Sequence, residues 1–410
     1  FNGEIFNAPQ LRKQLEYTGS VFQTDHSDTE VLLQLYKNFG PKMLDHINGM
    51  FAFVIYNPSK GTLFGARDHT GIKPFFYSCN TGQLIFASEL KSILKLPFIS
   101  RELDRQSIHH YLSFQFVPSP RTIYKDVKKL PAGHSFTYCV KTSTMVIERY
   151  WIPPFGDANR NMDVTTDSAA SAQLRTHLES AVKRWSTSDV PVGCSLSGGL
   201  DSSAVVGLMA QSSDQPVNTW SLGFEDLDEV FLDERALANE VSKKWGTNHH
   251  EIILRPRDIL NDLDSMVVSL DEPYAGGLPS WYVYKAMATE VKVVMTGTGG
   301  DELFGNYGKW RGYHGFSAIK RFAQRTKTQG INEVLRYPNG ARYNGYFLEN
   351  EKKKIWGNTH GLFESTPQFI EKIWREAKTS DPRQAVGYVD LATQLPEEFL
   401  MMTDRFSMAW

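Results

Sequence analysis

The sequence lacks the features that mark secreted, membrane-bound and nucleic-acid-binding proteins. Its 410 residues include only three cysteines, too few for a disulfide framework, and no His/Cys cluster or CxxC pair indicates zinc. No apolar run is long enough to cross a bilayer, and a net charge of -2 provides no basic surface for nucleic acid or anionic lipid. We therefore expect a cytoplasmic protein that binds small molecules, without nucleic-acid or membrane partners; a homodimer stays open.

The chain also lacks an initiator methionine and a closing helix cap. It begins with FNGEIFN and ends within the amphipathic stretch EEFLMMTDRFSMAW. We expect a fragment that is cut at both ends. Its length is too great for one average core and predicts two domains.

The first half combines two helices with short strands rich in aromatic and β-branched residues. A helix is predicted over 9–19, and a second over 27–40, where Ser27 and Glu30 have capping-box spacing. Strands separated by turn-forming residues are predicted at 49–57, 61–68, 73–78 and 83–89. These four strands predict an antiparallel meander.

The second half alternates strands and helices. Strands are predicted at 190–196, 217–224, 248–254 and 291–297, and helices between them at 201–212, 232–246 and 257–270. This order predicts a parallel sheet flanked by helices. The polar, turn-rich stretch 154–170 is the expected linker between the two halves.

The segment SLSGGLDSS, at 195–203, follows a buried strand and opens a helix. Its glycines allow close approach of a ligand, and the helix-start N–H groups and serine hydroxyls can bind a polyphosphate. Asp201 would repel phosphate, which makes it a candidate Mg²⁺ ligand. The loop has neither the Walker A lysine nor dinucleotide-fingerprint spacing. The candidate phosphate-binding residues are Ser197, Gly198, Gly199, Asp201, Ser202 and Ser203.

Two later segments should meet this loop. Residues 293–308, VVMTGTGGDELFGNYG, and 219–226, TWSLGFED, also follow strands, and ligands of open parallel sheets lie beyond the carboxyl ends of the strands. Asp201 and Asp301 could then share one Mg²⁺ on a pyrophosphate. The alternative role for Asp301 is a helix N-cap.

At these residues the sequence resembles the glutamine-hydrolysing asparagine synthetase family. SGGLDSS resembles the pyrophosphate loop of ATP pyrophosphatases, and the resemblance extends over almost the whole chain. The other matching segments are DEP at 271–273, GTGGDELFG, RDHTGIKPFFY, FASELKSIL, YLSFQFVPSPRTIY and KKLPAGH.

The resemblance implies a fold class and a domain plan. Residues 1–153 would form an N-terminally truncated glutaminase domain with an antiparallel sheet of the N-terminal-nucleophile type. Residues 171–410 would form a C-terminally truncated, parallel-sheet synthetase domain of the ATP pyrophosphatase type. The whole is therefore expected to combine α/β and α+β architecture.

The resemblance also implies an activity, with ATP and Mg²⁺ as cofactors. ATP would be cleaved between its α- and β-phosphates to activate a carboxylate, in most relatives aspartate, as an acyl-adenylate that ammonia then attacks. Leu222 and Gly297 would contact the adenosine. Thr298 stands where asparagine-forming relatives often carry a glutamate, and threonine is a poor base at neutral pH. The acyl acceptor therefore stays open, and a ring-closing enzyme that resembles β-lactam synthetase, or an inactive binding protein, remains an alternative.

For the glutaminase half, FNGEIFN resembles the segment that follows the family's catalytic N-terminal cysteine. Asn2 and Gly3 would form the oxyanion hole, while Glu4 and Asp28 would bind the α-amino group of glutamine. Asp28 has the alternative role of a charged residue in the first turn of a helix. The nucleophilic cysteine is absent, so this fragment should not hydrolyse glutamine.

The remaining cysteines and histidines have structural interpretations. Cys79 is expected in a hairpin turn, Cys139 in or near a strand, and Cys194 in the core. The pair His249 and His250 should start a strand. His109 and His110 should begin a helix-to-loop stretch, and neither pair has metal-binding spacing. Arg67 and Asp68 are expected in a structural network near the domain interface.

Overall fold

The computed structural model describes the chain apart from residues 81, 157–165, 226–233, 306, 314 and 341–344. It divides into two compact units. Unit 1 comprises Phe1–Arg160, Asp271–Ala275 and Glu302–Met401, and unit 2 comprises Asn161–Leu270, Gly276–Asp301 and Met402–Trp410. Most of the predicted linker 154–170 lies outside the described residues. The domain boundaries at 153 and 171 stay predictions.

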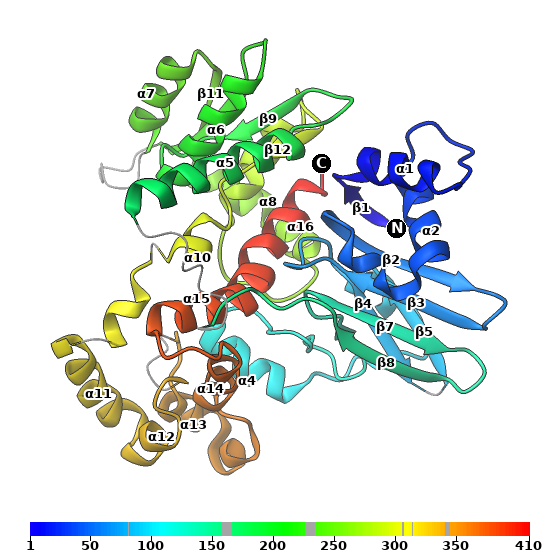
Figure 1. Ribbon diagram of the computed structural model, residues 1–410. Coiled ribbons are helices and arrows are strands. Elements are labelled where there is room, and N and C mark those ends of the chain that lie inside the picture. The colour runs from blue at the N-terminus through cyan, green and yellow to red at the C-terminus, as the bar shows by residue number, and fades with distance from the viewer. Residues whose placement is uncertain (81, 157–165, 226–233, 306, 314, 341–344) are drawn as a thin grey trace. The chain divides into compact units, whose positions relative to one another are not determined.

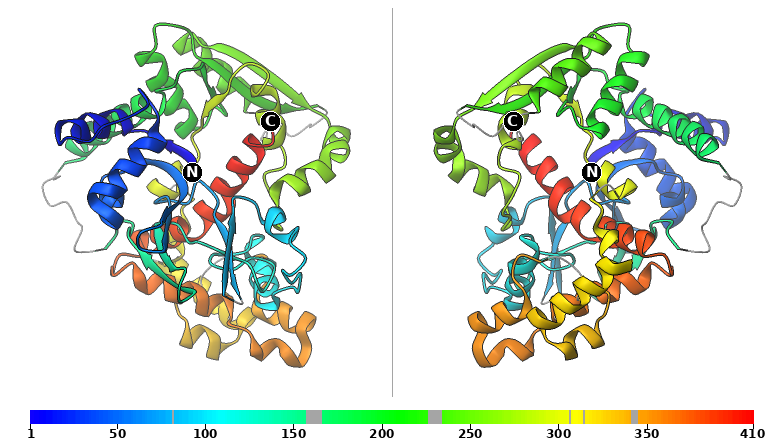
Figure 2. Two further views of the ribbon diagram at one scale, coloured as in Figure 1. Left: turned by 90° about the vertical axis from the view of Figure 1, so that its right-hand side faces the viewer. Right: turned by 90° about the vertical axis from the view of Figure 1, so that its left-hand side faces the viewer.

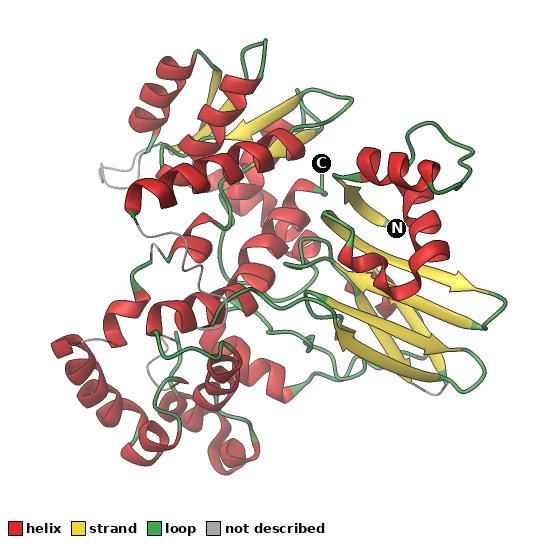
Figure 3. Ribbon diagram, in the orientation of Figure 1, coloured by secondary structure: helices red, strands yellow, loops and turns green. Residues whose placement is uncertain are grey.

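Unit 1 begins with an antiparallel sheet covered by two helices (Figures 1 and 3). The strand order is β1-β2-β3-β7-β8. The bounds are β1 Asn2–Ile5, β2 Gly49–Asn57, β3 Thr62–Arg67, β7 His134–Cys139 and β8 Thr144–Arg149, with α1 Ala8–Tyr17 and α2 Asp28–Phe39. Ser27 caps α2 by accepting the Glu30 N–H, as its spacing predicts. Buried residues of α1, α2, β2 and β3 share one core, which includes Leu11, Leu35 and Phe64.

The predicted four-strand meander is wrong. Strand β3 pairs with β7, while β4 (Phe76–Asn80) and β5 (Gln83–Ala87) join β6 (Lys128–Lys129) in a second sheet, of order β5-β4-β6. The chain leaves the first sheet at Asp68, whose buried carboxylate accepts the N–H groups of Ile72 and Lys73 at 2.9 Å. The neighbouring Arg67 guanidinium donates to three backbone carbonyls. These bonds hold a turn that separates β3 from β4, and the predicted structural network at these two residues is present.

Two local predictions are also wrong. Cys79 lies within strand β4 and not in the hairpin turn that follows it. His109 and His110 lie inside α4 (Arg105–Phe114), both fully buried, where we expected the start of a helix-to-loop stretch. Helix α4 is capped by Asp104, and its buried face includes both imidazoles because tertiary partners are available to them.

The rest of unit 1 is mostly helical, and Figure 2 shows the gold and orange helices α11 to α14 gathered without strands. Helix α10, Gly300–Phe304, passes from unit 2 into unit 1. The remaining helices are α3 Leu90–Leu94, α11 Gly315–Gln329, α12 Ile331–Arg336, α13 Glu349–Trp356, α14 Thr366–Glu376 and α15 Pro382–Ala392, with 3₁₀ turns η1 Gly40–Asp45, η4 Lys309–Tyr313 and η6 Gly357–Leu362 and the π-helical turn η7 Leu395–Leu400.

Unit 2 contains the predicted parallel sheet, in the order β11-β10-β9-β12. The strands are β9 Val192–Ser195, β10 Asn218–Phe224, β11 Asn248–Leu254 and β12 Val293–Met295. The helices are α5 Asp167–Trp185, α6 Leu200–Ser212, α7 Arg235–Trp245, α8 Pro256–Leu270, α9 Ser280–Met287 and α16 Met401–Ser407, of which the first residue belongs to unit 1. Gly246 ends α7 in the left-handed conformation, as predicted.

The core of unit 2 lies under the strand that leads into the phosphate loop. Cys194 and Leu196 are buried against Val206 of α6 and Ala238 of α7. Burial raises the pKa of the Cys194 thiol to about 12, so this cysteine is a packing residue.

His249 and His250 begin β11, as expected. Within the described residues, no helix has the length and apolarity needed to cross a membrane.

Candidate ATP and glutamine sites

The turn between β9 and α6 requires glycine. Gly198 has a φ of +80°, and a Cβ there would lie 2.7 Å from the Cβ of Leu237 and 2.8 Å from the backbone nitrogen of Ala238. Helix α7 therefore packs directly against the turn. A bulkier residue would push the loop and α7 apart, so the tight approach of the two segments explains the glycine at this position.

Serine side chains hold the turn together from within. The Ser197 and Ser202 hydroxyls lie 3.0 Å apart, and the Ser202 Oγ also accepts the Ser197 N–H. The Ser197 Oγ accepts the N–H of Gly199 at 3.3 Å. The Ser203 Oγ is buried and has no hydrogen-bond partner among the described residues. An unpartnered hydroxyl in the first turn of a helix is the kind of donor that an anion at the helix start can use.

A second glycine-rich loop reaches the same turn from β12. A Cβ on Gly297 would lie 2.6 Å from the Ser202 nitrogen, and one on Gly300 would lie 2.3 Å from the Asp201 Cγ. Strand β12 is the direct neighbour of β9, so these loops emerge side by side at the carboxyl edge of the sheet. The expected convergence of the segment at 195–203 with the part of the later segment that includes Gly297 and Gly300 is therefore present within unit 2.

Asp201 and Asp301 interact electrostatically at this edge. Burial, and then the negative charge of Asp301, raise the pKa of the Asp201 carboxyl above its ordinary value. Two carboxylates that repel each other beside this glycine-rich turn fit a shared divalent cation, since oxygen ligands suit Mg²⁺. Thr298, three residues before Asp301, is exposed. Its backbone N–H donates to the Thr296 hydroxyl at 3.3 Å.

The third predicted segment is partly described. Leu222 lies on β10, half-buried, between the edge strand β11 and the central β9. Arg235 of α7 covers the next residue, since a Cβ on Gly223 would lie 2.2 Å from the Arg235 Nε. Glu225 forms an ion pair with Arg255 at 2.7 Å. Asp226, the second acid of this segment, lies outside the described residues.

The candidate glutamine site gathers around β1 in unit 1. Gly3 has a φ of +142°, and a Cβ there would lie 2.0 Å from the Met50 carbonyl oxygen. The Asn2 side chain donates to the Ser88 hydroxyl at 3.2 Å. Asp28, the first residue of α2, accepts the Ile5 N–H on Oδ2 at 3.2 Å. The start of α2 is thereby attached to the strand that carries Asn2, Gly3 and Glu4, which brings the four predicted residues onto two adjoining elements.

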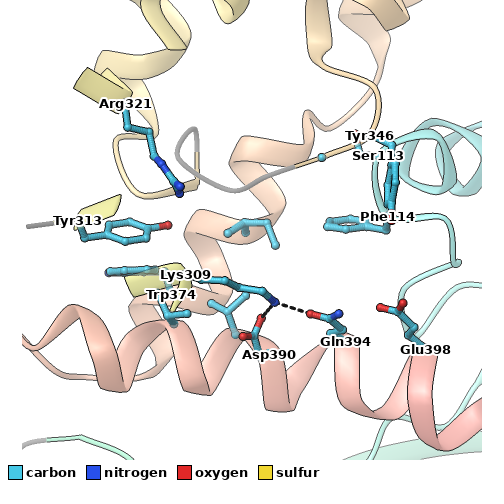
Figure 4. Close-up of a pocket in the computed structure, with 14 residues that line it drawn as sticks. Ser113, Phe114, Lys309, Tyr313, Arg321, Tyr346, Trp374, Asp390, Gln394 and Glu398 are labelled. Carbon is cyan, nitrogen blue, oxygen red and sulfur yellow. Dashed lines mark hydrogen bonds and ion pairs between the residues drawn. The ribbon is translucent and has the colours of Figure 1, made fainter. Parts of the chain in front are cut away.

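Unit 1 also contains a cavity lined by charged, aromatic and aliphatic side chains. Its volume is about 270 Å³, and Figure 4 shows the Lys309 ammonium hydrogen-bonded to the side chains of Asp390 and Gln394, which line the cavity. The Lys309 ammonium lies 2.8 Å from Asp390. Burial raises the pKa of the Asp390 carboxyl above its ordinary value, although the charge of Lys309 and its hydrogen bond to Asp390 act to lower that pKa. Aromatic rings of Phe114 and Trp374 form other walls. No motif predicts this cavity, because its lining comes from residues 113–114 and 309–398.

Two protein-family descriptions match successive stretches of the chain. Residues 1–151 match the description "Glutamine amidotransferase domain", and residues 173–410 match "Asparagine synthase". The chain belongs to the asparagine synthase family. Its expected family and fold class, an antiparallel sheet followed by a parallel one, are therefore confirmed. The roles of the individual site residues stay predictions.

Curated relatives match along the chain. Asparagine synthetase [glutamine-hydrolyzing] 1 of Bacillus subtilis is 32% identical over all of this chain and 66% of its own length. A putative asparagine synthetase [glutamine-hydrolyzing] of Mycobacterium tuberculosis is 30% identical over all of this chain and 65% of its own. A putative asparagine synthetase [glutamine-hydrolyzing] 2 of Methanocaldococcus jannaschii is 36% identical over 75% of this chain and 58% of its own. The chain thus spans about two thirds of the length of the first two relatives.

Proposed function

We propose that the protein is an ATP-consuming ligase that amidates a carboxylate, with aspartate as the favoured acceptor and glutamine as the nitrogen donor. Membership of the asparagine synthase family supports this activity. The observation that carries it is the approach of Gly300 to Asp201, which sets two acidic residues beside a glycine-requiring turn at a strand edge. The reaction would convert ATP to AMP and pyrophosphate.

The turn at 195–203, here called the phosphate turn, would bind the phosphates of ATP through its backbone N–H groups and a serine hydroxyl. Backbone N–H groups at the start of α6, with the Ser203 hydroxyl, would donate to the pyrophosphate. Asp201 and Asp301 would hold Mg²⁺, which when bound neutralises charge on the departing pyrophosphate. Leu222 and Gly297 would contact the adenosine through their backbones. These residues would act mainly in the adenylation step, by stabilising negative charge on the pyrophosphate that leaves as the carboxylate attacks the α-phosphorus. The acyl-adenylate then has AMP as a good leaving group when ammonia attacks its acyl carbon.

The first unit would supply ammonia. Asn2 and Gly3 would donate to the oxyanion formed when a cysteine nucleophile attacks the amide of glutamine. Glu4 and Asp28 would pair with the substrate's α-amino group. The three cysteines of this chain lie on strands β4, β7 and β9, so the resemblance assigns the nucleophile to a residue preceding Phe1.

Thr298 bears on the acyl acceptor. Because its hydroxyl is a poor base, the proton released on amide formation would go to another group or to the substrate. We therefore propose amidation of a carboxylate as the reaction class and aspartate as its first candidate. A ring-closing use of the same adenylation site is the second candidate, for which Thr298 is the supporting observation.

The complete protein of this reading frame allows a direct test. Incubation with Mg²⁺-ATP, ammonium and aspartate should release pyrophosphate and AMP in equal amounts with asparagine. Glutamine should replace ammonium only if a cysteine precedes the FNGEIFN segment. Absence of carboxylate-dependent pyrophosphate release with any acceptor in a panel of amino-acid and β-amino-acid substrates would overturn the proposal. Release with another acceptor alone would exclude aspartate and retain the reaction class.

A further inference from the structure

Three potential metal ligands converge in unit 1, far from both candidate sites in the sequence. They are His109 on α4, Glu349 at the start of α13 and His360 on η6, and their ligand atoms all lie within 4.8 Å of one another. The Glu349 Oε2 lies 3.2 Å from the Nε2 of each imidazole. Bonds of about 2.0–2.2 Å to a tetrahedral zinc ion would place neighbouring ligands about 3.4 Å apart. The two separations from Glu349 are close to this value, and the two imidazoles offer ligand atoms within 4.8 Å of each other.

The potential ligand atoms of Glu349 and His360 have few hydrogen-bond partners. The Glu349 Oε2 and the His360 Nε2 are buried, and beyond the 3.2 Å approaches within the cluster neither has a hydrogen-bond partner among the described residues. The His109 side chain is fully buried, and its Nε2 is within 3.2 Å of the Lys352 ammonium. As an acceptor this nitrogen is unprotonated, and a metal ion would displace the Lys352 ammonium from its lone pair.

Surrounding groups orient the carboxylate. The other oxygen of Glu349, Oε1, accepts from Lys352 at 2.6 Å and from the Thr366 N–H at 3.0 Å. These bonds leave Oε2 directed towards the two imidazoles. The His109 ring stacks on Phe363 at a centroid distance of 5.1 Å, and the Trp356 ring lies 6.5 Å away. A set of two histidines and one glutamate with an oriented carboxylate and an apolar surround is typical of protein-bound zinc.

We propose that His109, Glu349 and His360 bind one zinc ion, which fastens the turn η6 and the start of α13 to helix α4. Zinc is favoured over magnesium because two of the three ligands are imidazoles. Helix α13 and the turn η6 follow each other in the sequence, whereas α4 is far from both, so the ion would close a long loop between His109 and the pair formed by Glu349 and His360. Lys352 would remain bonded to Glu349 and Thr366, and its positive charge would weaken the affinity for the cation.

The test uses the tag-free chain, stripped of metal and titrated with zinc against a chromophoric chelator. One equivalent should bind, and zinc should raise the thermal unfolding midpoint, whereas magnesium should not. His360→Ala should lose more than the roughly 10- to 100-fold in affinity that removal of an outer-shell partner costs. This side chain is about one-fifth exposed, so the variant should fold. His250→Ala, which alters a histidine of unit 2, is the matched control and should bind zinc normally.

Two further measurements separate the proposal from a metal-free ion-pair network. Cobalt should give the intense visible absorption of a tetrahedral site in the wild type and not in His360→Ala. Lys352→Met should bind zinc more tightly than the wild type, because a repelling charge is removed. Absence of a zinc equivalent from the wild type, or equal zinc affinity in the wild type and His360→Ala, would overturn the proposal.

Discussion

The ammonium of Lys129 lies 2.6 Å from the carboxylate of Glu397, and both side chains are buried. A second carboxylate, that of Glu272, approaches the same ammonium at 3.0 Å. The ion pair joins β6 in the second sheet of unit 1 to the π-helical turn η7. Neither glutamate could be assigned to Lys129 from the sequence, because the three residues belong to separate stretches of the chain.

The Lys129 network should contribute strongly to stability. Lys129→Met removes the ammonium that two buried carboxylates share and leaves the more distant Arg67 guanidinium, 3.9 Å from Glu397, which should cost about 3–5 kcal/mol of unfolding free energy. Lys125→Met, which removes an exposed ion pair with Glu102, should cost only about 0–1 kcal/mol. Urea unfolding monitored by tryptophan fluorescence measures both. Equal losses in the two variants would contradict the role of the buried network.

The same network predicts an alkaline pH dependence. Burial lowers the pKa of Lys129, but Glu272 and Glu397 outweigh burial and raise it above its ordinary value of 10.5. The folded state therefore holds this proton more tightly than the unfolded state. The stabilisation is complete below the ordinary value and is lost as pH rises through the raised one. The stability difference between wild type and Lys129→Met should be constant from about pH 6 to 9 and shrink above about pH 10.4.

The phosphate turn should not tolerate a side chain at Gly198. Alanine there must adopt a positive φ, at a cost of about 1–2 kcal/mol, and must also displace α7. Gly246→Ala provides a matched control, since Gly246 has a φ of +65° with nothing within 4 Å of an added Cβ. Gly198→Ala should lower the thermal midpoint further and abolish Mg²⁺-ATP binding in calorimetry. Normal ATP binding by Gly198→Ala would remove this turn from the nucleotide site.

Substitution of Asp201 should increase the thermal stability of the protein and decrease its enzymatic activity. Because Asp301 and burial raise the Asp201 pKa, the charged carboxylate is held unfavourably in the free protein. Asp201→Asn should therefore raise the thermal midpoint without ligands. It should lower pyrophosphate release by more than the roughly 10- to 100-fold typical of outer-shell residues. Asp214→Asn, on the exposed turn after α6, is the control for both readouts. Undiminished release would exclude Asp201 as a metal ligand.

Asp28 should bind the α-amino group of glutamine. Asparagine at this position can still accept the Ile5 N–H, so Asp28→Asn should keep the fold. Loss of a charged hydrogen bond, worth about 1.5–3 kcal/mol, should weaken binding of L-glutamate or L-glutamine roughly 10- to 150-fold. Asp25→Asn, on an exposed residue paired with His26, should bind normally in the same calorimetric titration. If Asp28→Asn binds L-glutamate or L-glutamine with unchanged affinity, Asp28 has only a structural role at the start of α2.

Local signals in the sequence determined much of the secondary structure. The Ser27 cap, the Gly246 stop and the strand–helix alternation after residue 190 each depend on neighbours within a few residues, and the structure contains all three. The tight turn between β9 and α6 was also predictable from its consecutive glycines and serines between a buried strand and a helix, and its role in phosphate binding stays a prediction.

Tertiary structure decided the pairings between distant segments. Strand β3 has the same residue pattern whether it pairs with β4 or β7, and the bonds made by Arg67 and Asp68 settle the choice. His109 and His360 carry no shared motif, since their proximity depends on how α4, α13 and η6 pack. The sequence by itself therefore determined the elements and the glycine-rich turns, where the interactions are local. Only the fold decided which distant charges and imidazoles meet, because those contacts depend on packing across the whole of unit 1.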